Sequence, residues 1–353
     1  MIEVRPYEGS AEDLSNFVTA TWRRDYAGKM AFPLWSAEYL RWQLRLDEER
    51  FRKYQVAAYD GTRLVGTLLA APCAFQTPEG RVAGAHGSWL AVDPEYRGQK
   101  IVGRMAEERV RRVAEDGGRL VVSYRFFGSK HSLAERPPTD KVDGGKTFIG
   151  KRGFWARVLD TPRAARWNVL GWESILTRVG GPFTPHPRVT TAKGVIRPAR
   201  DEDIPRCVEL MRKMTARMSV AVAWDEELLR HELLGSPVAQ TLVTETEGTV
   251  RGFVNFHVLP FLGRTEEPVG VFDIVCLEAV TSRDCVPLVN AALAAMREQG
   301  GVLALKIGCG DAPWGTLLWT HFVPRLPDSY LVFQWPQAPI VGNLSGPMHL
   351  LWR

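Results

Sequence analysis

An internal repeat constrains the fold of this 353-residue chain more than any other feature of its sequence. Val4-Arg5-Pro6 and Ile196-Arg197-Pro198 each precede acidic residues and an amphipathic run, at an offset of 192 residues (197 − 5). Apolar runs that end in Pro72 and Pro260 follow at an offset of 188 residues (260 − 72). A short strand, an acidic helix start and a hairpin are therefore predicted twice, in the same order.

The repeat continues in each half with an apolar strand and a helix that stops at a pair of glycines. These three features span 86–92, 98–116 and 117–118 in the first half, and 271–280, 285–299 and 300–301 in the second. Glycine suits the end of a helix because it adopts the left-handed conformation without strain. We expect an α/β (α+β) fold of two tandem domains, residues 1–185 and 186–353. Each domain is predicted to be a mixed, mostly antiparallel sheet flanked by helices.

Composition excludes several classes of protein. With 45% hydrophobic and 24% charged residues, the chain is neither disordered nor a collagen-like or disulfide-stapled scaffold. Its longest nearly uncharged stretch near the start, 67–75, is far shorter than the ~20 residues of a membrane span, and the N-terminus lacks a secretory signal. We therefore expect a cytoplasmic protein without a membrane span. Neither the five cysteines nor the seven histidines have the spacing of metal ligands, so no metal is predicted.

The net charge of +5 (45 − 40) and the pI of about 9.0 make the chain mildly basic. Nucleic-acid binders often show such a balance, but a polyanionic small ligand such as a nucleotide explains it equally well.

The segment from Trp89 to Met105 is the most informative for chemistry. An apolar strand ends at Val92, Asp93-Pro94 predicts a turn, and a helix follows from a glycine-containing loop. Such a helix start leaves backbone N–H groups unpaired at the positive end of the helix dipole, where they bind pyrophosphate. Basic side chains in this loop would add charge for further phosphates. The alternative is a plain strand–loop–helix unit with a solvated basic rim.

This segment resembles the acyl-CoA loop of the GNAT acyltransferase superfamily. The family pattern is Gln or Arg, two residues, Gly, one residue, then Gly or Ala, after an acidic-Pro-x-aromatic-Arg turn. Arg97 fits the first position, whereas Lys100 and Val102 stand where the family has glycine or alanine. The resemblance implies acyl-CoA as the co-substrate. The implied acyl-CoA-binding residues are Leu90, Ala91, Val92, Arg97, Gly98, Gln99, Lys100, Ile101, Val102, Gly103 and Arg104.

A longer resemblance is to the N-myristoyltransferases, a GNAT branch that is itself a tandem duplication. Residues 36–44 are similar to that family's Glu-Phe-Leu-x-Trp-Ala-Leu helix, 97–103 to its Arg-Ser-Lys-Arg-Leu-Ala-Pro loop, and 330–336 to its Tyr-x-x-Tyr-Asn-Trp strand. Two signatures of the family are replaced, at 85–90 and 321–328. The resemblance therefore implies a tandem GNAT fold and leaves open the acyl length and whether the acceptor is a small-molecule or a peptide amine.

The resemblance also implies a set of catalytic groups. The backbone N–H groups of Trp89 and Leu90 would stabilise the thioester oxyanion. The base in N-myristoyltransferases is the C-terminal carboxylate, which corresponds here to Arg353, and the apolar run before it predicts a final strand that buries it. From the residues alone, other candidate bases are Asp273 and Glu278 in the second-half strand and His86 in the first; a desolvated acid would have a raised pKa. The alternatives are a frayed, polar C-terminal end and acids that simply face solvent.

The second-half turn, 281–287, differs from its counterpart in the first half. It has no glycine, and it carries an acid and a proline where free N–H donors would be needed. We therefore expect one acyl-CoA per chain, with the second half forming a wall of the acceptor site.

Three functions stay open at this stage. The first is an acyl-CoA-dependent N-acyltransferase that moves an acetyl to fatty acyl group to a primary amine by direct attack. The second is a transferase on the same fold that uses aminoacyl-tRNA, for which a pyrophosphate loop would be unnecessary. The third is a non-catalytic CoA-binding module. No DNA partner is expected.

Overall fold

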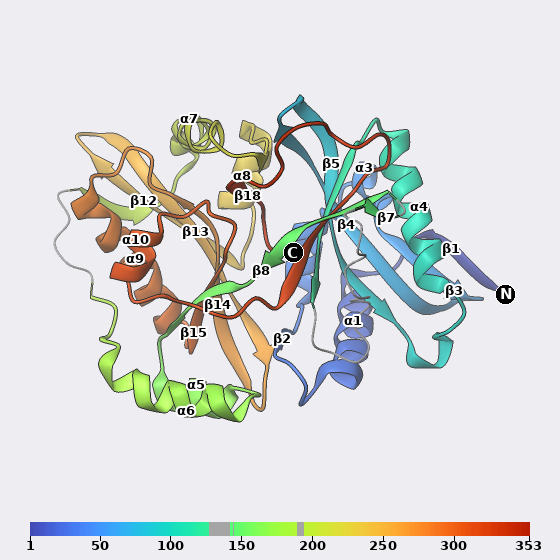
Figure 1. The fold of residues 1–353 in the computed structure, drawn as a ribbon, viewed down its shortest axis with the longest axis horizontal. Coiled ribbons are helices and arrows are strands. Elements are labelled where there is room, and N and C mark those ends of the chain that lie inside the picture. Colours follow the sequence, from blue (N-terminus) through green and yellow to red (C-terminus); the bar gives the residue numbers. More distant parts are fainter. Residues whose placement is uncertain (127–141, 144, 189–193) are drawn as a thin grey trace.

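The computed structural model describes residues 1–126, 142–143, 145–188 and 194–353, which form two sheets flanked by helices (Figure 1). The first sheet has the order β1-β3-β4-β5-β6-β17-β8-β7, and along this order it is antiparallel except for the parallel pair β5–β6. Its strands are β1 (Ile2–Pro6), β3 (Val56–Asp60), β4 (Arg63–Thr77), β5 (Gly80–Val92), β6 (Leu120–Phe126), β17 (Ser329–Gln334), β8 (Lys146–Arg152) and β7 (Val142–Asp143). Two short strands, β11 (Val220–Val222) and β18 (Met348–His349), extend it beside β4.

The second sheet repeats this plan with the order β10-β12-β13-β14-β15-β9-β16, again with one parallel pair, β14–β15. Its strands are β10 (Val195–Pro198), β12 (Ala239–Thr246), β13 (Thr249–Leu262), β14 (Glu266–Cys276), β15 (Leu303–Ile307), β9 (Phe154–Val158) and β16 (Val323–Pro324), with β2 (Phe32–Pro33) beside β13. The predicted fold class of two tandem mixed sheets is confirmed.

The two sheets exchange strands across the middle of the sequence. β9 pairs with β15 in the second sheet, and β17 pairs with β6 and β8 in the first. Each sheet thus contains a strand from the other half of the chain. The proposed division at residues 185 and 186 stays a prediction, because hydrogen bonding ties the halves together on both sides of it.

Ten α-helices occur in the described residues, and local sequence signals explain several of their ends. Ser10, Ser36 and Asp225 cap α1, α2 and α8 by accepting a hydrogen bond from the backbone three residues on. The helices are α1 (Ala11–Tyr26), α2 (Ala37–Leu44), α3 (Glu49–Arg52), α4 (Ile101–Glu115), α5 (Thr161–Trp167), α6 (Gly171–Gly180), α7 (Ile204–Thr215), α8 (Glu226–Leu234), α9 (Ser282–Glu298) and α10 (Trp314–Trp319).

The glycine pairs end α4 and α9 as predicted. Gly117 and Gly300 have φ of 71° and 83°, and the following glycine N–H donates to a carbonyl five residues back in each case. Helix α4 begins at Ile101 rather than at the predicted Gly98. The reason is local: Gly98 and Lys100 both adopt positive φ, 81° and 57°, which a right-handed helix cannot contain.

A hydrophobic core continuous across both sheets surrounds the C-terminal residues. Val122, Ile274 and Leu351 belong to the same cluster of buried side chains, and Figure 1 shows the C-terminal end between the two sheets. The predicted final strand is only partly found, since β18 ends at His349. The remaining residues are irregular but buried, so the expected burial of the last residue is observed without the strand.

Candidate active site

The central parallel strands of the first sheet separate near their middle. β5 and β6 pair from Gly84 opposite Leu120 to Gly87 opposite Ser123. Beyond that point β5 continues along β4, whereas β6 continues along β17. The last residues of β5 are therefore hydrogen-bonded within the sheet on one side only, and the edge that faces β6 is open.

A β-bulge occupies this open part of β5. Thr67 pairs with Ala91 and Leu69 with Ser88, so Trp89 and Leu90 stand opposite the single residue between those two on β4. Trp89 has a φ of 50°, in the left-handed region that costs a bulky residue on the order of 1–3 kcal/mol. Bulges re-aim the backbone and are common beside active sites.

Two side chains fix the orientation of the bulge. The Thr67 hydroxyl donates to the carbonyl oxygen of Trp89, and the Trp22 indole N–H donates to that of Leu90, both at 2.9 Å. The predicted oxyanion donors thus lie in a strained, side-chain-braced turn of the central strand.

The loop after β5, which the sequence predicts to bind phosphate, is exposed and leads into the start of α4. Asp93 accepts a hydrogen bond from the backbone of Glu95 and ends the strand, and residues 97–100 are exposed. Lys100 precedes α4 without a capping side-chain bond, and the first turn contains no acid. The first N–H groups of α4 therefore have no intrahelical acceptor and face a loop that is open to solvent.

The basic residues of this loop differ in how they are used. The Arg97 guanidinium donates to Asp25 of α1, which is only 8% exposed, and to the carbonyl of Val92 at 3.3 Å. Arg104 donates to the carbonyl of Ile2 at 2.9 Å. Arg97 thus ties the loop to α1, a contact that no pattern in the sequence indicates. Within the part of the chain that the structure describes, the Lys100 ammonium forms no ion pair and is exposed.

Arg353 is buried in an ion cluster formed by residues of the second half. The side chain of this residue, which is 5% exposed, donates to Asp273 of β14 at 2.8 Å and to Glu232 of α8 at 3.1 Å. His257 of β13 lies beside Asp273, with 3.2 Å between its Nδ1 and the carboxylate Oδ2. Glu232 and His257 were not among the predicted site residues, because their only signal is their position within apolar runs.

Asp273 and its neighbour Glu232 have shifted pKa values. Burial alone would raise the pKa of Asp273, but Arg353 and His257 outweigh it and hold the pKa well below its ordinary value. The expectation of a raised pKa at Asp273 is therefore wrong: this carboxylate is ionised and paired. Burial raises the pKa of Glu232, although Arg353 opposes the shift.

The other two base candidates from the sequence lie in different environments. Burial lowers the pKa of His86 to about 3, so the imidazole is neutral. The Glu278 carboxylate accepts from Arg217 at the surface, at 3.0 Å. Neither belongs to the ion cluster around Arg353.

A layer of aromatic rings connects the bulge to the C-terminal residues. The Trp35 ring centroid lies 5.7 Å from that of Trp89 and 5.9 Å from that of Trp352. Among the described residues, the indole N–H groups of all three are buried and without a hydrogen-bond partner.

A cavity of about 430 Å³ is lined by the end of β15, the segment that follows it and α10, together with Trp155 of β9. Its wall includes Lys306, whose ammonium is 2.8 Å from Asp311, and Asp311 in turn is 2.9 Å from His349. Tyr124, the first residue of β6 beyond its pairing with β5, has its hydroxyl 3.5 Å from the sulfur of Cys309 in the same segment. This site was not predicted; the sequence signal that could have indicated it is a lysine, Lys306, inside the apolar strand 302–307.

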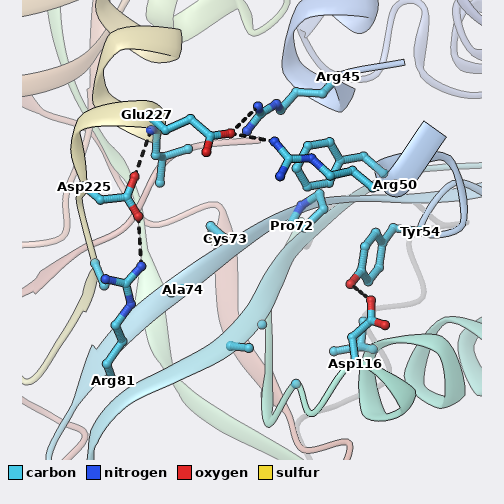
Figure 2. Close-up of a pocket in the computed structure, with 17 residues that line it drawn as sticks. Arg45, Arg50, Tyr54, Pro72, Cys73, Ala74, Arg81, Asp116, Asp225 and Glu227 are labelled. Atoms are coloured by element: carbon cyan, nitrogen blue, oxygen red, sulfur yellow. Dashed lines mark hydrogen bonds and ion pairs between the residues drawn. The ribbon is translucent and has the colours of Figure 1, made fainter. Parts of the chain in front are cut away.

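A second cavity, of about 260 Å³, lies away from the acyl-CoA loop (Figure 2). It is lined by Asp116 just after α4, whereas the loop precedes that 15-residue helix, which is about 22 Å long. Figure 2 shows its charged groups engaged with one another: Arg45 and Arg50 with Glu227, at 2.8 and 2.6 Å, and Arg81 with Asp225, at 2.9 Å. These charged side chains at the cavity wall are thus paired with one another.

The second-half turn differs as the sequence indicated. The Thr281 hydroxyl donates to Asp284 at 2.7 Å, and this buried carboxylate occupies the first turn of α9. Pro287 lies inside the helix. An acid at the helix N-terminus uses the favourable interaction that a phosphate would otherwise make.

Comparison with known proteins supports the fold. Residues 21–128 match the family model of the acetyltransferase (GNAT) domain. The whole chain is similar in fold to Saccharomyces cerevisiae N-myristoyltransferase solved with bound myristoyl-CoA, with a TM-score of 0.76 and 14% identity over 100% of this chain and 89% of that one. No curated protein matches the chain in sequence.

Two GCN5-related N-acetyltransferases are similar in fold at lower scores. That from Kribbella flavida has a TM-score of 0.53 and 15% identity, covering 94% of this chain and 71% of that one. That from Anabaena variabilis has a TM-score of 0.54 and 12% identity, covering 94% and 72%. Together with the domain match, these findings show a GNAT-type fold with an architecture like that of N-myristoyltransferase, and they confirm the resemblance. No described helix is long and apolar enough to cross a membrane.

Proposed function

We propose that this protein transfers an acyl group from acyl-CoA to a primary amine by direct attack. The observation that carries the proposal is the braced bulge at Trp89, located where β5 leaves β6 on the strand that leads through an exposed loop into the uncapped start of α4. The diphosphate of CoA would bind residues 97–104, and the thioester would then lie along the open edge of β5.

The reaction needs oxyanion donors and a base. The amine nitrogen attacks the thioester carbon, the C–S bond breaks, and CoA leaves as the thiol after taking up the proton that the amine loses. The backbone N–H groups of Trp89 and Leu90 would stabilise the oxyanion, by roughly 3–4 kcal/mol for a well-placed donor. An amine with a pKa near ~10 must first be deprotonated, and we propose the carboxylate of Arg353 as the base. The pairs with Asp273 and Glu232 would hold that residue in place.

We infer the length of the acyl group and the place of the acceptor from the space around the bulge. Trp35, Trp89 and Trp352 fill the region beneath the bulge, which favours a short acyl group over a fatty one. The cavity lined by Lys306 would admit the acceptor, because Tyr124, where β6 leaves β5, contacts Cys309, which stands between two lining residues of that cavity. The Lys306–Asp311 pair offers that acceptor both a donor and an acceptor of hydrogen bonds.

Calorimetry with acetyl-, octanoyl- and myristoyl-CoA, followed by turnover assays with a panel of small amines and peptides, tests the proposal. We expect tight binding of acetyl-CoA and turnover of at least one amine. Binding without turnover of any amine would favour the non-catalytic module. Binding that strengthens with chain length would overturn the assignment of a short acyl group.

The base is tested by extending the chain after Arg353. Because the added residues remove the carboxylate from its buried position, we expect turnover to fall at least tenfold while acyl-CoA affinity is retained. An extension of equal length before the exposed Met1 serves as the control. Full activity of the C-terminally extended protein would assign the base to another group.

A further inference from the structure

Helix α6 has its polarity reversed relative to an ordinary surface helix. Trp172, Ile175, Leu176 and Val179 follow one another at helical spacing and are between 51% and 64% exposed. The opposite face packs on the protein through small polar groups: the Ser174 hydroxyl donates to the carbonyl of Ala165, and Thr177 accepts from Asn168. A helix that served only its own domain would bury the first set and expose the second.

The apolar surface continues beyond the helix. Phe183, just after α6, is 83% exposed, and Leu170, just before it, is 45% exposed. The Glu173 carboxylate accepts from Arg325, which places the exposed Val323 and Leu326 beside the helix. The α6 patch, as we name it, consists of Leu170, Trp172, Ile175, Leu176, Val179, Phe183, Val323 and Leu326. A contiguous exposed patch of this kind marks an interaction site.

The charges around the patch are basic. Residues 161–188 contain four arginines and one acid, and that acid, Glu173, is already paired with Arg325. Arg166, Arg178 and Arg188 are exposed and form no ion pair with the described residues. An apolar helical face that carries tryptophan and is flanked by arginine is typical of a helix that lies in the interface of an anionic membrane.

We propose that the α6 patch docks the protein on the surface of a membrane that contains anionic lipid. The ten residues of α6 span about 15 Å, too short to cross the ~30 Å hydrocarbon layer, so the helix would lie along the surface. A second copy of the chain is a poorer occupant, because a symmetric contact would bring the same arginines together. Docking would present the enzyme to substrates that partition into membranes.

Sedimentation of the full chain with vesicles tests the proposal. Vesicles of phosphatidylcholine alone are compared with vesicles that also contain phosphatidylserine, at low and high salt. We expect binding to the anionic vesicles, weakened by salt because the arginine contribution is screened. Absence of binding to both kinds of vesicle would overturn the proposal.

Two double variants make the test specific to the α6 patch. Ile175→Gln with Val179→Gln should weaken vesicle binding at least tenfold and leave the thermal melt unchanged, because both side chains are exposed. Val195→Gln with Val341→Gln, two exposed valines outside the patch, should bind as the wild type does. Equal loss in both variants would contradict a local site. A dimer in analytical ultracentrifugation that only the first pair abolishes would instead assign the patch to self-association.

Discussion

The two halves contain the same strand–turn–helix unit and use it in different ways. In the first half, β5 leads through the exposed residues Gly98 and Lys100 into α4, whose first turn is free of acid. In the second half, β14 leads into α9, whose first turn holds the buried carboxylate of Asp284 and, soon after, Pro287. The same topology therefore does not by itself make an anion-binding site. The residues of the first helical turn decide whether the N–H groups of that turn are available to a ligand.

The central strands extend the contrast. Both carry a bulge, at Trp89 in β5 and at Asp273 in β14. The first bulge turns the backbone at the open edge of the sheet. The second presents a carboxylate that holds Arg353. The bulge in β5 would therefore serve the reaction. The bulge in β14 holds Arg353, whose carboxylate we propose as the base.

Loss of the second-half anchor should have the largest effect. Asp273→Asn leaves the buried Arg353 guanidinium with a single carboxylate partner, so we expect the free energy of unfolding to fall by about 3 kcal/mol or more. Urea denaturation measures this loss. Glu278→Gln, which removes a surface partner of Arg217, is the control and should cost at most about 1 kcal/mol. Equal losses would show that the buried cluster is no anchor.

Charge reversal in the first-half loop should have the next largest effect. Lys100→Glu with Arg104→Glu places two negative charges at the proposed diphosphate site, and we expect acyl-CoA to bind about 100-fold more weakly. Both side chains are exposed, so the melting temperature should stay near that of the wild type. Arg283→Glu, in the corresponding turn of the second half, is the matched control. If that variant lost affinity and the first did not, the roles of the two turns would be reversed.

Lowering the pH should destabilise the folded protein through His86 of β5 and Asp273 of β14, and the effect of His86 should begin at the higher pH. The pKa of His86 in β5 falls from 6.5 to about 3 on folding because of burial, so only the unfolded state takes up its proton between these values. Its contribution to stability is complete above pH 6.5 and falls as the pH drops, by about 1.4 kcal/mol per unit. The lowered pKa of Asp273 acts only below 3.8.

Urea denaturation of wild type and His86→Leu from about pH 7 to about pH 4 measures this dependence. We expect the difference in unfolding free energy between the two proteins to change with pH over that range. A constant difference would mean that the imidazole is not held neutral in the folded state.

Features set by neighbours in the sequence could be predicted. The repeat, the glycine ends of α4 and α9, and the exposed loop before α4 all depend on short patterns of apolar, glycine and capping residues. The resemblance at 36–44 likewise fell on a helix, α2.

Features set by distant contacts could not be predicted. The exchange of β9 and β17 depends on pairing between residues more than 140 positions apart, such as Leu303 with Val158. Two ion pairs likewise join segments that are remote in the sequence, Arg97–Asp25 and Arg353–Asp273, so no local pattern predicts them. The left-handed backbone conformation of Trp89 could not be predicted, because a tryptophan in an apolar run predicts ordinary strand geometry.

A crystal structure of the protein with bound CoA tests the central claim most directly. We expect density for the diphosphate against the N–H groups of residues 98–103, with the pantetheine arm directed toward Trp89 and Leu90. Density for the nucleotide against residues 281–287, or a first-half loop closed by its own side chains in the complex, would contradict that claim.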